Sequence, residues 1–359
     1  WVLGKTGIRN RCRGIDEDPR RNPGLTWGRE YKDQLRQATS LDTMAEVEIH
    51  GGTFAGVAAA VRLARVGHTV RLVEESSNWA DILRGQLGDT LDFPAPWRDL
   101  LKKSGRPAAG ALGARGLMLV PDPEGPPTDR GQLWYADRDR LGETAATTWR
   151  DFVDTTDDLW QRLRPLGLEA ELSPSRVRAA RLDPRRSLTD MARLLDNPEL
   201  AARVTGIATT AGVDPDATPG WLVSRLSVTR TFGRWRLVDH AGQPRPASDL
   251  VDVLLDRLDQ RQVTVTDSPG ISDGIIDTRD PQLGWRRPRR FRPHDSFVEQ
   301  LLARPPIRTP DPTRFHASVA SPGGDEPWAQ LLSGALATYA AHATFTGEDI
   351  RPSNRSPGR

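Results

Sequence analysis

"VEIHGGTFAGVAAAVRLARVGHTVRLVEES", residues 47–76, predicts a strand, a tight turn, a helix and a second strand in succession. Val47 and Ile49 alternate with polar neighbours, as the residues of a strand do. Helix-forming residues then fill positions 54–66, and the apolar run 70–73 predicts the second strand. The stretch therefore has the order of a βαβ unit.

The turn of this unit has the glycine spacing of a dinucleotide-binding site. In such sites the first glycine makes the tight turn, the second lets the backbone approach a pyrophosphate, and the third lets the helix pack on the strand. An acid about 20 residues later holds the ribose hydroxyls. Gly51 and Gly56 match the first and third roles, and Glu74 at the end of the second strand matches the acid.

Thr53 stands where the second glycine is expected. A β-branched residue resists a positive φ and adds bulk where a phosphate should approach. Its hydroxyl could instead donate a hydrogen bond to a phosphate oxygen, and the amides at the helix N-terminus still attract an anion. The alternative is a fold that keeps its packing glycines and has lost its ligand. We expect a dinucleotide pyrophosphate to bind the six residues of the turn, which are Gly51, Gly52, Thr53, Phe54, Ala55 and Gly56.

The composition predicts a globular chain. Of its 359 residues 37% are hydrophobic, and 50 basic against 48 acidic residues give a net charge of +2. Acids and bases are interspersed, which argues against nucleic-acid binding. A single cysteine, Cys12, excludes an internal disulfide framework, and the six histidines lack the spacing of a metal site. With no apolar run of 18 residues and no signal-peptide pattern, we expect a cytoplasmic protein without a membrane span.

The chain divides by composition into several parts. Residues 1–43 are polar and lack an apolar period, so we expect a disordered leader or an upstream extension. Residues 44–143 and 233–350 alternate short apolar runs with helical periods, as a dinucleotide-binding α/β domain does. Residues 144–232 are predicted to be helical and to form a cap, or substrate section, over that domain. Residues 351–359 are expected to be disordered.

Three further strands are predicted in the α/β part, at 117–121, 263–265 and 274–278. In the helical section, Asn197 and Pro198 predict a break between two helices.

Two helices of the α/β part have predicted starts. Ser248 is expected to cap a helix whose apolar residues recur every four positions. Near the end of the chain a Gly-rich turn precedes a helix, with Asp325 as its expected cap and Pro327 in its first turn.

Three segments together resemble one known family. The unit at 47–74 resembles the FAD-binding start of the flavin amine oxidase and phytoene desaturase superfamily. "PAPWRDLLKKSGRP", residues 94–107, is similar to a segment of phytoene-desaturase-like proteins. "PGGDEPWAQLLSGALATYA", residues 322–340, resembles the closing motif of the superfamily. The resemblance implies an α/β fold, with a Rossmann-like FAD/NAD(P)-binding domain and a helical insertion as a reduced substrate domain.

The closing motif implies further site residues. In the superfamily a Gly-acid turn approaches the flavin or its pyrophosphate, and here Gly324 and Asp325 would form that turn. Ser333, Gly334 and Ala337 would pack the helix that follows. The resemblance implies FAD as the cofactor, and no catalytic residue is predicted.

Two departures from the family bear on the expected function. Family members follow the ribose acid with a Gly-Gly pair that passes the flavin ring, and "EESSNWADILRGQLGD", residues 74–89, contains no such pair. The chain is also shorter than family members, which leaves the helical section as the main part of any substrate domain.

The leading hypothesis is an FAD-dependent oxidoreductase that removes hydride from an apolar or amine substrate. Its main rival is a non-catalytic dinucleotide-binding or interaction protein that kept the fold. A third hypothesis is binding of NAD without flavin, and Glu74 would then disfavour the 2′-phosphate of NADP. The substrate and the oligomeric state are not predicted.

Several other side chains have two interpretations. His50, at the strand end beside the turn, either packs there or is the titrating group closest to the cofactor. Trp97, Trp149, Trp160 and Trp235 are either core residues or the lining of an apolar pocket.

Overall fold

The computed structural model describes residues 44–125, 130–168, 174–183, 185–209, 214–279, 305–317 and 326–352. They belong to one compact unit that begins at Met44, and residues 1–43 lie outside the described residues. The predictions for the leader, for Gly324 and Asp325, and for the tail after residue 352 also lie outside them.

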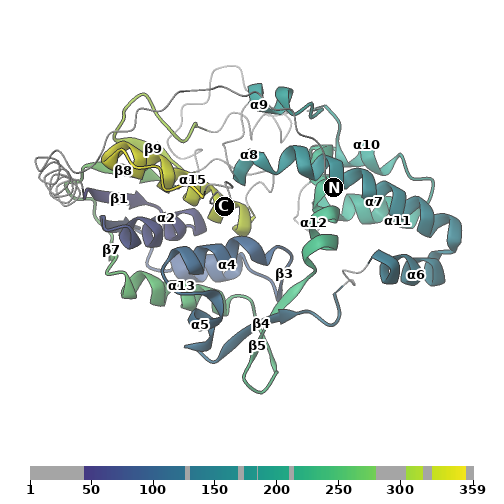
Figure 1. The fold of residues 1–359 in the computed structure, drawn as a ribbon, viewed down its shortest axis with the longest axis horizontal. Helices are drawn as coiled ribbons and strands as arrows, with labels where there is room; N and C mark the ends of the chain where they lie inside the picture. The colour runs from purple at the N-terminus through teal and green to yellow at the C-terminus, as the bar shows by residue number, and fades with distance from the viewer. Residues whose placement is uncertain are drawn as a thin grey trace, which may run out of the picture. The chain divides into compact units, whose positions relative to one another are not determined.

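A five-stranded parallel sheet lies at one end of this unit, and its strand order is β7-β2-β1-β8-β9 (Figure 1). Every neighbouring pair in the sheet is parallel. Val47 and Ile49 lie on one face of the central strand and Glu48 on the other, and all three are buried, as expected for a parallel sheet covered on both faces. The strands are β1 (Glu46–His50), β2 (Thr69–Val73), β7 (Thr264–Thr266), β8 (Gly274–Asp277) and β9 (Arg314–His316).

Helices connect and cover these strands, which makes this an α/β fold. Helix α2 (Phe54–Arg65) joins β1 to β2, and the long α15 (Pro327–Thr346) packs closely along it (Figure 1). Helix α13 (Asp249–Gln260) precedes β7 and contacts α2 and α3 (Trp79–Gly85). The predicted βαβ unit is confirmed almost to the residue, because its apolar periods are unbroken from 47 to 73.

A second, antiparallel sheet has the order β3-β5-β4, with β6 paired to β5. The strand predicted at 117–121 is present, but it pairs with β5 and does not join β1 and β2. An apolar run predicts a strand without naming its partner, so this difference was not visible in the sequence. The strands are β3 (Thr90–Leu91), β4 (Leu117–Pro121), β5 (Trp235–Asp239) and β6 (Pro244–Arg245), with α4 (Pro94–Lys103) and α5 (Ala108–Gly113) between β3 and β4 in the chain.

The described residues of 144–232 are predominantly helical, as predicted. Asn197 ends the loop before α11, and its side-chain oxygen accepts hydrogen bonds from the amides of Glu199 and Leu200, which explains the break at Pro198. The helices of this region, with α6 before it, are α6 (Arg130–Leu141), α7 (Glu143–Leu163), α8 (Pro165–Leu168), α9 (Pro174–Ala179), α10 (Leu188–Ala192), α11 (Pro198–Thr209), η1 (Gly220–Ser224) and α12 (Arg225–Phe232).

Two predicted helix caps differ from the structure. Ser248 precedes α13, but its backbone is already helical and its side chain makes no capping hydrogen bond to the described residues. Glu326, and not Asp325, occupies the cap position of α15, with Pro327 first in the helix as expected. Among the described helices none is long and apolar enough to span a membrane.

Candidate functional site

The turn at 51–56 joins the carboxyl end of β1 to the amino end of α2. Gly51 has φ +111°, and its amide donates to the carbonyl oxygen of Val73 at 2.9 Å. A Cβ atom on Gly51 would stand 2.8 Å from Thr278 Oγ1 on the neighbouring strand end. Both its backbone conformation and its surroundings therefore require glycine.

Thr53 is the N-cap residue of α2, and this corrects the expectation that the position needs a positive φ. Its φ of −91° and ψ of 168° are extended, so the position needs no positive φ. Its Oγ1 accepts from the Gly56 amide at 3.0 Å and donates to Thr278 Oγ1 at 2.9 Å. In this structure the Thr53 hydroxyl therefore has both its donor and its acceptor role within the protein. Threonine suits this turn because the cap position uses the extended backbone that a β-branched residue prefers.

The side chains at the start of α2 are tightly packed, so only the backbone there is available to bind a ligand. A Cβ on Gly56 would overlap the carbonyl oxygen of Gly51. Phe54 is fully buried, with its ring edge-on to Trp97 at 5.4 Å, and Ala55 is buried as well. Because the first amides of a helix have no intrahelical acceptor, Phe54 and Ala55 offer their N–H groups rather than their side chains to a ligand.

Glu74 lies at the turn, where its carboxylate binds two backbone amides. Oε2 accepts from the Gly52 amide at 2.6 Å, and Oε1 accepts from the Ser76 amide at 2.9 Å. The amide of Glu74 itself donates to Thr266 at the end of β7. The structure therefore brings together Glu74 and the glycine turn, which the sequence placed at one edge of the sheet.

Trp79, at the start of α3, was not predicted as part of this site. A Cβ on Gly52 would stand 2.8 Å from its indole ring, so the ring rests directly on the turn. Helix α3 occupies the stretch after Glu74 where the family has its Gly-Gly pair. A tryptophan five residues after Glu74, in "EESSNW", was the one feature of the sequence that could have indicated this contact.

The end of β8 supplies two further residues that the sequence did not indicate, Thr278 and Arg279. The Arg279 stem would stand 2.9 Å from a Cβ on Gly51, and its guanidinium pairs with Asp277 at 2.7 Å. Burial raises the pKa of Asp277, but hydrogen bonds from Arg279 outweigh it and lower the pKa below its ordinary value. Only the sheet order, which sets β8 beside β1, brings these residues to the turn.

His50 belongs to a cluster beneath the turn. Its Nε2 lies 3.0 Å from the carboxylate of buried Glu48, which also binds Arg71 at 2.9 Å and the Gly270 amide at 2.5 Å. Burial raises the pKa of Glu48, but these hydrogen bonds and charges together lower it by more. The pKa therefore falls below its ordinary value. These contacts favour the packing interpretation of His50.

The other segments of the resemblance hold the helices around the turn. A Cβ on Gly334 of α15 would overlap the carbonyl oxygen of Ala55, so this glycine permits the close approach of α15 to the start of α2. Ser333 Oγ donates to the Ala317 carbonyl at 2.6 Å, and Ala337 is fully buried.

Residues 94–107 also contact the helices around the turn. Asp99 pairs with buried Arg62 of α2 at 2.6 Å, and Arg62 in turn donates to the Tyr339 hydroxyl at 3.3 Å. The Ser104 carbonyl accepts a hydrogen bond from Arg257 of α13 at 2.5 Å. In the described chain these motif residues contact neighbouring helices, which is a packing role.

The four tryptophans proposed for an apolar pocket do not share a cavity among those lined by described residues. Trp97 is in the core, and Trp160 packs edge-on to Phe93 at 6.0 Å. Trp235 donates to the Phe232 carbonyl at 2.6 Å and carries Arg98 over its ring. Trp149 lines a cavity of about 460 Å³.

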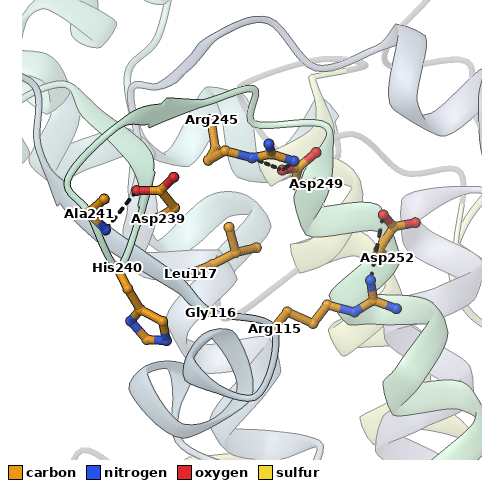
Figure 2. Close-up of a pocket in the computed structure, with 9 residues that line it drawn as sticks. All are labelled: Arg115, Gly116, Leu117, Asp239, His240, Ala241, Arg245, Asp249 and Asp252. Atoms are coloured by element: carbon orange, nitrogen blue, oxygen red, sulfur yellow. Dashed lines mark hydrogen bonds and ion pairs between the residues drawn. The ribbon is translucent and has the colours of Figure 1, made fainter.

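A different cavity, of about 510 Å³, lies between the second sheet and the start of α13 (Figure 2). Figure 2 shows that its charged side chains pair with one another, Arg245 with Asp249 at 2.8 Å and Arg115 with Asp252 at 3.7 Å. Arg115 also binds Asp256, which lowers the pKa of that carboxyl. No predicted site residue lines this cavity.

Within the described residues, no group of three or more His, Cys, Asp or Glu side chains could hold a metal ion. No protein-family model matches the chain, and no curated protein sequence does either.

Proposed function

We propose that this chain binds FAD at the carboxyl ends of β1 and β2 and acts as an FAD-dependent oxidoreductase. One observation carries the proposal: the amino end of α2 and the carboxylate of Glu74 meet at one turn, built by Gly51 and Gly56. A helix N-terminus attracts a pyrophosphate, and a carboxylate at this position accepts from ribose hydroxyls.

The strand order supports a Rossmann-like assignment of the α/β fold. If the five parallel strands are numbered by their order in the chain, their order across the sheet is 3-2-1-4-5. The direction of winding therefore reverses between β1 and β8. In open α/β sheets ligands bind outside the carboxyl ends of the strands at such a reversal. The turn at 51–56 and Thr278 lie on its two sides.

The residues present fit such a ligand. The amides of Phe54 and Ala55 would hold the pyrophosphate, and Glu74 would accept from the ribose hydroxyls through the lone pairs that Gly52 and Ser76 leave on its oxygens. Gly324 and Asp325, outside the described residues, remain the proposed contacts to the ribityl side.

FAD, when bound, supplies the hydride-accepting chemistry, so the protein needs to bind, orient and exclude water rather than to provide an acid and base pair. The resemblance to amine oxidases and phytoene desaturases makes an apolar or amine compound the proposed substrate.

Trp79 favours a second candidate, a dinucleotide-binding protein without flavin chemistry. Its ring rests on Gly52, and α3 replaces the family's Gly-Gly pair. NAD is the ligand of this alternative, and the acid at Glu74 disfavours the 2′-phosphate of NADP.

The test is the visible spectrum of the purified chain, followed by titration with FAD and with NAD. Saturable uptake with flavin absorbance supports the first function, whereas thermal stabilisation by NAD alone supports the second. Gly56→Val should abolish uptake, because its side chain would meet the Gly51 carbonyl. Gly85→Val, with no atom within 4 Å of its Cβ, is the matched control. A Gly56→Val protein that binds like wild type would show that the turn is wrongly assigned.

A further inference from the structure

Three helices of the 130–232 region each present one face to a cavity of about 460 Å³. The lining residues recur at helical spacing on α6, α7 and α12, and α11 adds one side chain. A volume of this size lies within the range of roughly 300–1,000 Å³ common for small-ligand sites. None of the residues at 51–56 lines it, so the cavity is separate from the proposed dinucleotide site.

The walls of the cavity are largely apolar. Trp134 of α6, Trp149 and Val153 of α7 and Leu226 of α12 all line it. The Trp149 ring is stacked on Phe152 at 5.8 Å, which fixes its plane. Rigid aromatic walls of this kind bind apolar or aromatic groups at little cost in side-chain entropy.

The charged side chains of the lining carry an excess of one sign. Arg140, Arg150, Arg203 and Arg230 line the cavity, and Asp137 is the acid among the lining residues. Arg203 pairs with Asp137 at 2.9 Å and lies 5.1 Å from the centre of the Trp149 ring, so these two charges are mutually satisfied.

Buried Arg230 is held by two aspartates, because Asp154 binds its Nη1 at 2.7 Å and Asp157 its Nη2 at 2.5 Å, while its Nε has no hydrogen-bond partner among the described residues. Its guanidinium therefore stays with the two aspartates, which lie outside the lining.

Arg140 and Arg150 differ from the other two arginines because they are exposed. Their side chains are 59% and 47% exposed, and their partners, Glu199 and Asp151, are exposed as well. Exposed ion pairs of this type contribute little to stability, so either arginine can exchange its partner for a ligand anion.

We propose that this cavity binds an amphiphilic carboxylate, a molecule with an apolar body and one acid group. The apolar body lies against Trp134, Trp149 and Leu226, and the acid pairs with Arg140 or Arg150. The site goes beyond the proposed FAD function and needs no dinucleotide.

The experiment is a calorimetric titration of the full chain with decanoate and with decanol, which has the same chain and no charge. Wild type should bind one decanoate about threefold to fivefold more tightly than decanol, because an ion pair with an exposed arginine strengthens binding only modestly. The double variant Arg140→Gln/Arg150→Gln should lose about this factor for decanoate and none for decanol.

Two further variants locate the site. Leu226→Trp should weaken both ligands by filling the cavity, and Ala136→Trp, at an exposed lining position on α6, does the same if the first variant fails to fold. Arg115→Gln/Arg245→Gln makes the same change of charge at the cavity of Figure 2 and should leave binding unchanged. The proposal is overturned by non-saturable binding, by decanol as tight as decanoate, or by a folded cavity-filling variant that binds like wild type.

Discussion

The carboxylate of Glu74 accepts a hydrogen bond from the backbone amide of Gly52, with 2.6 Å between Oε2 and N. This bond joins the tip of β2 to the turn that follows β1. The protein itself thus holds the acid in place, and a ligand with a ribose has no side chain to order there. Pre-organisation of this kind reduces the entropy that binding costs.

Glu74→Gln should weaken binding of the dinucleotide and destabilise the turn. Glutamine is neutral and offers one oxygen, so the amides of Gly52 and Ser76 both lose a charged partner and one of them loses its acceptor. We expect a loss of about 1–3 kcal/mol in unfolding free energy and an increase in Kd of at least tenfold. Urea unfolding and FAD titration measure the two effects. The exposed neighbour Glu75 provides the control, and equal effects of Glu75→Gln would contradict the role of Glu74.

Thr53→Val should destabilise the protein even though it preserves the shape of the side chain. The Gly56 amide and Thr278 Oγ1 would both lose the partner they have in Thr53. We expect a loss of about 1–2 kcal/mol, the usual effect of removing a threonine cap. Thr53→Ser keeps the hydroxyl and should be close to wild type, while Thr53→Gly should lose only a few tenths of a kcal/mol. Comparable unfolding midpoints for the valine and serine variants would exclude the capping role.

Gly334→Ala should destabilise the protein, whereas Gly206→Ala should stabilise it. On α15 the added methyl group of the first variant would meet the Ala55 carbonyl, and the required shift of the helices costs about 1–3 kcal/mol. On α11 nothing lies within 4 Å of the corresponding atom of Gly206, and alanine favours the helix by about 0.5–1 kcal/mol. Thermal unfolding of the two variants in parallel measures the difference. A Gly334→Ala protein as stable as wild type would show that the helices can separate freely.

Elements that depend on residues close together in the chain could be predicted from the sequence. The βαβ unit at 47–73, its glycine turn and the strand at 274–278 all depend on short-range periodicity and backbone conformation. The three-residue strand β9 was not predicted, because it is too short to have a period of its own.

Long-range contacts around the turn could not be read from the sequence. Thr278 and Arg279 reach Gly51 only because β8 is inserted beside β1, and Trp79 reaches Gly52 only because α3 begins against the turn. The conformation of Thr53 was predicted incorrectly because the glycine pattern was taken to require a positive φ, whereas the cap position is extended.

A buried pair of histidines connects β2 to α15 and has defined protonation. The Ala45 amide donates to His68 Nδ1 at 3.1 Å, so the proton of His68 resides on Nε2, 2.9 Å from His342 Nδ1. His342 therefore carries its proton on Nε2, which lies 3.7 Å from the carboxylate of Glu348. The two residues are only 4% and 3% exposed. Burial, together with the neighbouring His342, lowers the pKa of His68 to about 4.

This pair should make the protein less stable as the pH falls from 6.5 toward 4. In that interval the unfolded His68, with its ordinary pKa of 6.5, is protonated while the folded one is still neutral, so the unfolded state binds more protons. The contribution is fully present above pH 6.5, and at about 1.4 kcal/mol per pKa unit about 3 kcal/mol is lost by pH 4. His68→Gln should be less stable than wild type at neutral pH, because it loses the bond to His342, and the difference should narrow on acidification. Urea unfolding at a series of pH values measures it, with His240→Gln on the exposed β5–β6 hairpin as control. A His68→Gln protein with the same pH dependence as wild type would assign the acid sensitivity to other groups.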